Sequence, residues 1–400
     1  MSLPVPPRVA AAAGRRVHRA GRIAVAGALG LLLGGLLGAC ASAPAPGTAA
    51  SVDDGSLAGY YWQSISGHLG LLHAARPVAD WIADPATPEP LRARLELAQR
   101  LRDFGVAELG LPDNASYRRY ADIGRPSVVW NVVAAPELSL TLETWCFPVL
   151  GCVGYRGYFD EARARALGDK LRAAGLEVAV YGVPAYSTLG KLPAGLVPWL
   201  ADPLLSTFIH YSDAELARMV FHELAHQVVY AEGDTLFNES FATAVERIGA
   251  DLWLARHGSD ADRAAYAAVQ QRRADFQALT QDYRQRLLAL YTSGLDPAAL
   301  RLRKAALMAE LRAAHQRLKT GRWGGYAGYD GWFERANNAA LGVLAAYNAR
   351  VPAFERLYER EGRHFGRFYA EVARLAALPP DARQAALDAL EHQSAAVVPH

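Results

Sequence analysis

The sequence predicts an α+β protein that is predominantly α-helical, with a small mixed sheet in its first half and a long helical C-terminal region. Apolar residues recur at helical spacing from residue 59 to about 121 and again beyond residue 249. β-Branched and aromatic runs are instead concentrated between residues 127 and 189. With 400 residues, the chain is long enough for a large core in one or two domains.

Residues 1–39 have the pattern of a secretory signal peptide. Basic residues precede an apolar run from Ile23 to Leu37, and small residues then lead to Cys40. The alternative is a membrane-spanning anchor, but the run is short for a span and is interrupted by glycines. The ending Leu37-Gly38-Ala39-Cys40 resembles a bacterial lipobox, which implies cleavage before Cys40 and a lipid on that cysteine.

Residues 40–58 are predicted to form a flexible tether, because residues 41–51 are rich in Ala, Pro, Ser and Gly. The body that follows has no strong charge. Five arginines and no acidic residue precede Cys40, so removal of the signal changes the net charge from +2 to −3. This balance argues against a nucleic-acid partner.

Residues 59–190 are predicted to form a helical lead-in followed by a small mixed α/β unit. The run from Leu91 to Phe104 has helical spacing, whereas residues 128–133 and 176–181 read as strands around a helix near 160–174. Cys146 and Cys152 lie six residues apart within this unit. For an exported chain they predict a loop disulfide, and the alternative is two free thiols.

The strongest functional signal is the segment His222-Glu223-Leu224-Ala225-His226. Residues four apart lie on the same face of a helix, so both imidazoles can reach one metal ion, with Glu223 beside it. An H-E-x-x-H motif on a helix is the minimal arrangement for a catalytic zinc and its general base. The alternative is a chance match on an ordinary buried helix.

A catalytic zinc usually takes three protein ligands, and Glu239 follows the second histidine by thirteen residues. Gly233 is expected to end the first helix, and Asp234 or Thr235 to cap the next, so that the chain doubles back. Glu246 lies two helical turns beyond Glu239. It is predicted to hold a ligand imidazole from outside the ligand set. The alternatives are a solvated or Arg-paired carboxylate, or the third ligand itself.

Residues 191–400 are predicted to contain this zinc-helix core and a helical C-terminal region. Ser212 and Glu215 form a capping-box pattern, which places the start of the zinc helix near Asp213. The turn Gly294-Leu295-Asp296-Pro297 separates two long apolar stripes and predicts a helical hairpin.

The segments His222–Gln227 and Asn238–Ala242 resemble the zinc core of the gluzincin aminopeptidases, in which H-E-L-x-H is followed by N-E-x-F-A. Over the wider chain, the lipobox, Tyr60-Tyr61-x-Gln63, Ala185–Gly190 and Tyr347-Asn348 are similar to a bacterial lipoprotein family of predicted zinc aminopeptidases. The resemblance implies one zinc ion held by His222, His226 and Glu239, with Glu223 as general base. Two features differ: the spacer has twelve residues instead of roughly eighteen, and a G-x-M-E-N motif is not found upstream.

The resemblance also implies a zincin-like core, with a sheet next to the zinc helix whose edge strand pairs with the peptide substrate. Tyr186–Gly190 is the candidate edge strand, and the alternative is a core or hairpin strand. Such enzymes stabilise the oxyanion with a later Tyr or His. Tyr347 is the first candidate, followed by Tyr329 and His364, each with core packing or surface display as the alternative.

The predicted function is peptide-bond hydrolysis by a membrane-tethered zinc enzyme that acts on a peptide substrate, as an aminopeptidase. The alternatives are an endopeptidase or cell-wall amide hydrolase that uses the same site, or a non-catalytic assembly lipoprotein of the envelope. Glu143 or Glu246 could hold a substrate α-amine. A lipid on Cys40 places the protein in the cell envelope facing the periplasm, and Ala41 after the cysteine favours the outer membrane.

Overall fold

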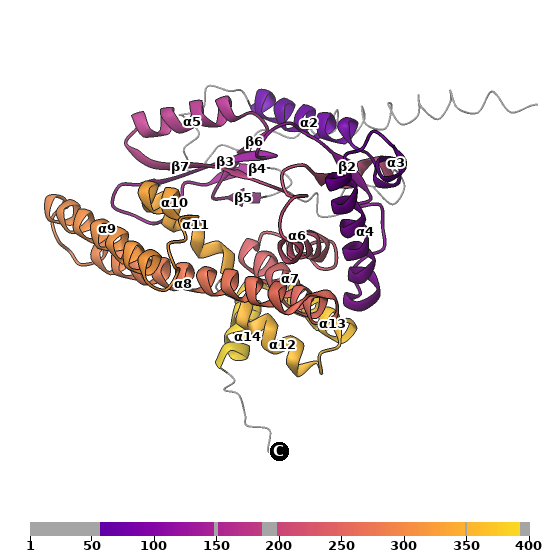
Figure 1. The fold of residues 1–400 in the computed structure, drawn as a ribbon. Helices are drawn as coiled ribbons and strands as arrows, with labels where there is room; N and C mark the ends of the chain where they lie inside the picture. The colour runs from indigo at the N-terminus through magenta and orange to yellow at the C-terminus, as the bar shows by residue number, and fades with distance from the viewer. Residues whose placement is uncertain (1–56, 148–150, 186–197, 349, 393–400) are drawn as a thin grey trace, which may run out of the picture. The chain divides into compact units, whose positions relative to one another are not determined.

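The chain is described by a computed structural model that covers residues 57–147, 151–185, 198–348 and 350–392 (Figure 1). The chain divides into two compact units, 1–48 and 49–400, and all of the described residues belong to the second unit. The predicted signal peptide, Cys40 and nearly all of the predicted tether lie outside the described residues, as does the candidate edge strand Tyr186–Gly190. Helices account for 64% of the described residues, and small sheets accompany them, which confirms the predominantly helical α+β class.

Within the described residues the strands form three small sheets, where the sequence predicts one small mixed sheet. A mixed sheet has the order β1-β2-β8, an antiparallel sheet has the order β6-β3-β7, and β4 and β5 form a hairpin. The strands are β1 (Arg76–Pro77), β2 (Arg119–Ala121), β3 (Val129–Pro136), β4 (Trp145–Phe147), β5 (Gly151–Val153), β6 (Arg156–Tyr158), β7 (Leu176–Val183) and β8 (Leu204–Leu205). The parallel β2–β8 pair joins residues that are more than 80 positions apart in the sequence. Strand patterns alone do not predict such a pairing.

Both faces of the β6-β3-β7 sheet are covered over part of their length. On one face, Trp130, Val132 and Ala134 pack against α5 (Glu161–Ala173). On the other face, Val133 and Ala135 pack against α11 (Asn338–Asn348). This two-sided burial explains why β3 is almost uniformly apolar. Figure 1 shows the two helices on opposite sides of the strands.

The predicted helical lead-in consists of α2 (Leu57–Ala74), α3 (Val78–Ala83) and α4 (Glu89–Leu109). Gly110 ends α4 in the left-handed conformation, with a φ of 63°, as expected for a glycine that terminates a helix. Gln63 fastens α2 to the sheet, because its Oε1 accepts from the Phe159 amide at 3.1 Å and its Nε2 donates to the Gly157 carbonyl at 3.4 Å.

The helix with the H-E-x-x-H motif, α6, runs from Asp213 to Ala225 and starts where the sequence predicts. The predicted capping box does not form, because Ser212 makes no side-chain cap hydrogen bond. Glu215 instead accepts hydrogen bonds from both terminal nitrogens of Arg273, a stronger charge-assisted partner than a backbone amide. The helix also ends earlier than predicted. The Gln227 and Val228 amides already close a tighter turn, and Gly233 lies in the following loop with a φ of 73°.

The next helix, α7, runs from Thr235 to His257 and packs alongside α6 (Figure 1). Asp234 caps it by accepting from the Phe237 amide at 2.9 Å, as one of the two predicted caps. A Cβ on Gly249 would lie 2.8 Å from the Phe221 ring of α6 and 2.6 Å from Leu109. The missing side chain therefore allows the two helices to approach closely.

The C-terminal half is helical, as predicted. It contains α8 (Asp260–Tyr291), α9 (Pro297–Thr320), α10 (Asp330–Arg335), α12 (Val351–Arg360), α13 (Phe365–Ala376) and α14 (Pro380–His392), and the 3-10 helix η1 (Pro198–Leu200) precedes α6. α8 and α9 form the predicted hairpin, and Asp296 caps α9 by accepting from the Ala298 and Ala299 amides.

One large core joins the lead-in helices to the helices that follow residue 190. It includes Leu95 and Phe104 of α4, Phe221 of α6, Phe241 of α7 and Phe368 of α13. Segments from both sides of the predicted boundary at residue 190 therefore contribute to the same core. Within the described residues, none of the helices combines the length and hydropathy needed to cross a membrane.

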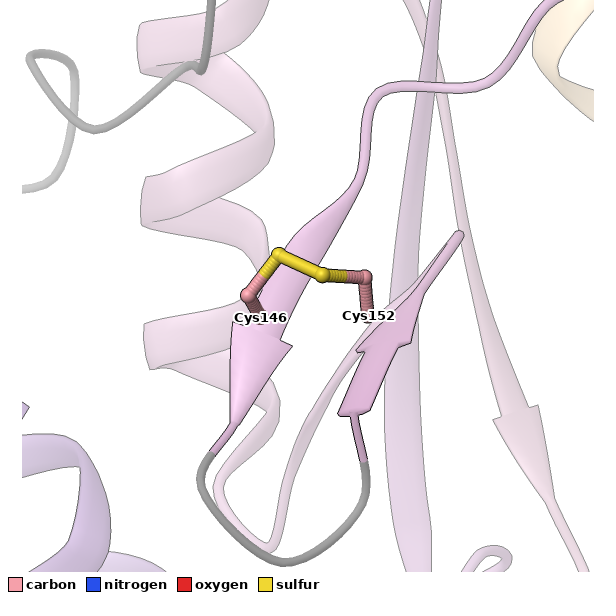
Figure 2. Close-up of a disulfide and its surroundings, with 2 residues drawn as sticks. All are labelled: Cys146 and Cys152. Carbon is pink, nitrogen blue, oxygen red and sulfur yellow. A yellow bond between two sulfur atoms is a disulfide. The ribbon is translucent and has the colours of Figure 1, made fainter. Parts of the chain in front are cut away.

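Cys146 and Cys152 form a disulfide across the β4–β5 hairpin (Figure 2). The two cysteines are direct partners in the ladder, with Trp145 opposite Val153 on one side of them. Cys152 and Val153 also line the cavity beside α6, so the disulfide ties one wall of that cavity to its neighbouring strand.

Candidate metal centre

Three predicted ligand side chains meet where α6 faces the start of α7. The Nε2 atoms of His222 and His226 are 3.2 Å apart. The carboxylate of Glu239 lies 3.4 Å from Nε2 of His222 and 3.8 Å from Nε2 of His226. One donor atom from each residue falls within 4.8 Å of the others. The structure thus brings together His222, His226 and Glu239, which the sequence placed on two separate helices.

The local sequence explains this arrangement. Val220, Phe221 and Leu224 on α6 have no exposed surface, and their burial turns the histidine face of the helix toward α7. His226 is the C-cap residue but keeps right-handed helical angles, so it still lies one turn from His222. The two imidazole rings are perpendicular to within a few degrees, at an interplanar angle of 86°.

Asn238, which precedes the predicted ligand Glu239, fixes the loop between the two helices. Its Oδ1 accepts from the Ala231 amide and its Nδ2 donates to the Ala231 carbonyl, both at 2.8 Å. Arg383 of α14 also holds the helix start through Asp234, at 2.7 Å. The Asn-Glu pair therefore combines a residue that positions the turn with one that faces the histidines.

Glu246 approaches Nδ1 of His222, whereas the other two predicted ligands lie at its Nε2. Its Oε2 is 3.0 Å from Nδ1 of His222. Arg218 hydrogen-bonds to Glu246, and its other terminal nitrogen is 3.5 Å from Glu215. This position suits a carboxylate that orients the His222 ring better than one that ligates a metal at Nε2.

The donor set fits a zinc ion. Zn–N bonds of 2.0–2.1 Å in a tetrahedral site place two ligand nitrogens about 3.3 Å apart. The 3.2 Å separation of the two Nε2 atoms matches this spacing, and the two oxygens of Glu239 lie close by, one 3.4 Å from His222 and the other 3.8 Å from His226. Two histidines and one glutamate also leave a fourth position open, as catalytic zinc sites do. Nδ1 of His226 is buried and has no hydrogen-bond partner among the described residues, whereas Nδ1 of His222 lies 3.0 Å from Oε2 of Glu246.

The carboxylates of the cluster favour a positive charge at His222. Burial lowers the pKa of His222, but the carboxylates of Glu239 and Glu246 outweigh burial and hold this pKa well above its usual value. Burial, and then the charge of His222, lower the pKa of His226 to about 4. Without a metal ion, the two carboxylates thus keep a proton on His222, where a metal would otherwise supply the positive charge.

Glu223 is buried, with 7% of its surface exposed, and it lines the same cavity as the three predicted ligands. Burial raises its pKa to about 7. The charge of His222 acts in the opposite direction and lowers this pKa, and the charge of Glu239 raises it. A carboxylate with a pKa near neutrality can both accept and return a proton at physiological pH.

A cavity of about 540 Å³ opens between the β6-β3-β7 sheet and the two helices of the cluster. Its described lining comes from α2, β3, β5, β6, β7, α6 and α7. Val129 and Asn131 of β3 face it, on the side of the sheet that α11 covers further along the strand. The cavity is therefore the stretch of this sheet face that α11 leaves uncovered, closed from the other side by the metal-site helices.

Other predicted site residues lie elsewhere. Tyr347 belongs to α11, but its side chain lies outside the described residues, so its role stays a prediction. Tyr329 stacks on Phe276 with ring centroids 4.6 Å apart in the α8–α9 region, and His364 caps α13. Neither they nor Glu143 are among the described residues that line the cavity.

Two tyrosines in the cavity were not predicted from the sequence. Tyr230 follows the second histidine by four residues, a proximity that could have identified it. Tyr155 lies between β5 and β6 and reaches the cavity through strand pairing, so local sequence carries no signal for it. For both, burial and then the charge of Glu239 raise the pKa, which keeps the hydroxyls protonated at neutral pH.

Comparison with known proteins assigns the chain to a family. Searches of curated proteins and of solved structures gave no significant match. A family model described as "Putative aminopeptidase" matches residues 59–387, a range that includes the whole cluster and its cavity. Since this match covers most of the sequence, the chain belongs to the putative aminopeptidase family.

Proposed function

We propose that the protein is a zinc-dependent peptidase of the aminopeptidase type, with His222, His226 and Glu239 as ligands of one zinc ion. The observation that carries the proposal is the close approach of one donor atom from each of these residues, within 4.8 Å of one another, beside the buried Glu223 in a substrate-sized cavity. Family membership supports peptidase activity independently. When bound, zinc would polarise the scissile carbonyl and lower the pKa of a water molecule toward neutrality.

Glu223 is the proposed general base. Its carboxyl group faces the cavity from α6, one position after the first ligand, and is not itself part of the three-residue donor group. It would take a proton from the attacking water and later deliver that proton to the leaving amine. Its pKa of about 7 suits both halves of this transfer.

Tyr155 is the described residue that we propose to stabilise the carbonyl oxygen in the transition state. It enters from the side of the sheet, whereas Glu223 enters from α6. A hydroxyl on the opposite wall can donate to the developing oxyanion while the base acts from the helix. Tyr347 stays an alternative for the same role.

Replacement of Tyr155 by Phe is expected to lower kcat by about 10²-fold or more, as does the loss of an oxyanion donor in other enzymes. Zinc content should not change, because Tyr155 is not in the donor group. The matched control is Tyr230→Phe, which removes the other described tyrosine hydroxyl near Glu239. If Tyr230→Phe lowers kcat and Tyr155→Phe does not, the two assignments must be exchanged.

Glu246→Gln is expected to weaken zinc binding by about 10- to 100-fold, the usual effect of losing a residue that orients a ligand. The reason is its position 3.0 Å from Nδ1 of His222, where it fixes the ring for metal binding through Nε2. Competition with a chromogenic chelator measures the affinity. Glu355→Gln is the control, since Glu355 also pairs with an arginine but is more exposed and lies outside the cavity lining. Equal affinities for the parent and Glu246→Gln would contradict this role.

Zinc binding is expected to release about one proton near pH 6.5. The pKa of His222 lies well above its usual value in the metal-free site, so this ring is protonated there and must lose its proton to ligate. Affinity should therefore increase as pH rises toward that pKa and level off above it. Calorimetry in buffers of different ionisation enthalpy counts the protons. Uptake of protons on binding would reverse the expected sign and contradict His222 as a ligand.

The position at which a peptide is cleaved distinguishes an aminopeptidase from the alternative functions. The zinc-loaded full-length protein in detergent should hydrolyse peptides with a free α-amine and leave N-acetylated versions of the same peptides intact. Hydrolysis of both would indicate an endopeptidase instead, and hydrolysis of cell-wall peptide alone would indicate an amide hydrolase of the envelope. Zinc binding without any hydrolysis would favour an assembly role. The buried Glu223 beside the ligands argues against that last outcome, since a structural metal site needs no base.

We also propose, from the sequence of residues 1–58, that a lipid on Cys40 anchors the protein to the envelope, facing the periplasm and on the outer membrane. The Cys146–Cys152 disulfide supports an oxidising compartment. Cys40→Ser should abolish incorporation of radiolabelled palmitate and release the protein from the membrane fraction. Retention of label in this variant would contradict the anchor.

A further inference from the structure

We infer that the cavity beside the metal cluster selects peptides with a bulky, uncharged, apolar side chain next to the scissile bond. The inference rests on the proposed peptidase function and specifies its substrate class. Three features of the described residues carry it: the sheet that forms one wall, the aromatic and apolar residues that surround it, and the distribution of charge.

The wall formed by the sheet is apolar near the cluster, apart from Asn131. Val129 of β3 and Val183 of β7 are direct ladder partners and both line the cavity. Gly157 of β6 pairs with Asn131 beside them. A Cβ on Gly157 would lie 3.0 Å from Val129 and 3.2 Å from Asn131. Because Gly157 has no side chain, it does not fill the cavity at this point of the sheet. The result is a shallow apolar floor opposite the zinc helix.

The opposite and lateral walls continue this apolar surface. Met219 on α6 precedes the ligand His222 by three residues and therefore lies on the same helix face. Phe159 contributes from the end of β6, where its ring packs over Gly67 of α2 so closely that a Cβ there would lie 2.3 Å from it. The remaining apolar lining residues are Val153, Pro184 and Ala185, with the rings of Tyr60 and Tyr155 beside them.

Charged groups among the described lining residues are confined to the predicted catalytic cluster. Among the described lining residues, only His222, Glu223, His226, Glu239 and Glu246 are ionisable apart from the tyrosines and the disulfide-bonded Cys152. A Lys, Arg, Asp or Glu side chain of a substrate would lose its hydration on entering this cavity. Outside the cluster, the described lining residues offer no opposite charge to pair with it. Burial of an unpaired charge is strongly unfavourable, whereas each buried methylene group is favourable.

The dimensions agree with this class of substrate. A volume of about 540 Å³ lies within the range of pockets that bury small ligands. It accommodates a large side chain in addition to the reacting peptide group. Apolar selection by such a pocket typically separates substrates by about 10- to 200-fold for each missing methylene group.

The test is a panel of tripeptides X-Ala-Ala with X as Leu, Phe, Ala, Asp or Lys, assayed with the zinc-loaded full-length protein. If only blocked peptides are cleaved, the acetylated series replaces it. The kcat/KM values for Leu and Phe should exceed that for Ala by about 10-fold or more, and those for Asp and Lys should fall below it. Preference for Asp or Lys in an active enzyme would overturn the inference but leave the peptidase function intact. Absence of hydrolysis for all peptides, blocked or free, would instead contradict the peptidase function.

Two variants test the walls. Val183→Phe should lower the Phe-to-Ala ratio of kcat/KM by about 10-fold with zinc content unchanged, because the new ring occupies the floor of the cavity. Met219→Ala enlarges the cavity from the opposite wall and should reduce the preference for Leu over Ala. Ile65→Phe is the control, since Ile65 lies on α2 with 37% of its surface exposed. Unchanged ratios in both cavity variants would show that these walls do not contact the substrate.

Discussion

Replacement of Glu223 by Gln is expected to lower kcat/KM by about 10²- to 10⁴-fold while the protein retains one zinc ion per chain. Glutamine preserves the size of the side chain but cannot accept the proton of the attacking water. Glu223 is also outside the group of His222, His226 and Glu239, so its replacement leaves the ligands in place. Loss of turnover without loss of metal separates a general base from a ligand.

The measurement combines steady-state kinetics with metal analysis of the same samples. Glu143→Gln is a matched control, because it makes the same chemical change in a carboxylate that is not among the described residues of the cavity lining. If Glu223→Gln keeps parental kcat/KM, Glu223 is not the base. If the variant loses zinc instead, the carboxylate contributes to metal binding and the role assigned to it here is wrong.

The second large effect is expected for Glu239→Gln, which should lose both zinc affinity and turnover. Glu239 supplies the only carboxylate within the compact donor group of the described chain, and its charge offsets that of the metal. We expect zinc affinity to fall by at least about 100-fold, the upper limit usual for residues outside the ligand set. Excess zinc in the assay should then restore part of the activity.

The comparison with Glu246→Gln tests which carboxylate is the ligand. Glu246 was the alternative third ligand from sequence, and it contacts Nδ1 of His222 instead of Nε2. Its replacement should weaken zinc binding less than replacement of Glu239 does. A larger loss for Glu246→Gln would reverse the two assignments.

Much of the site could be predicted because its residues lie on two consecutive helices. The four-residue spacing of the histidines and the N-E-x-F-A segment both depend on helical periodicity, which is a local property. Asp234 was one of two candidate caps, and it caps α7. The position of Glu246 beside His222 likewise follows from its spacing of seven residues from Glu239.

Local patterns failed where a distant partner competes for a side chain. In the sequence, Glu215 has the position of the second residue of a capping box. In the structure it accepts a hydrogen bond from Arg273 of α8, which lies 58 residues further along the chain. In this case a tertiary hydrogen bond replaces the local one that the pattern anticipates. The end of α6 differs for a local reason: the Gln227 and Val228 amides close a tighter turn, so the helix stops before Gly233.

The cavity could not be predicted because long-range pairing creates it. Val129 and Val183 become neighbours only when β3 pairs with β7, and Tyr155 arrives with β6 on the other side of β3. These residues carry no motif. Their contribution to substrate selection depends on strand register, which a single sequence specifies only through the completed sheet.

The most direct test of the account is zinc content measured together with peptide turnover on the full-length protein in detergent, before and after removal of metal by a chelator. We expect one zinc ion per chain, loss of hydrolysis when the metal is removed, and recovery when zinc is returned at one equivalent. Hydrolysis that persists at full rate in the metal-free protein, or purified protein that binds no zinc at His222, His226 and Glu239, would contradict the central claim.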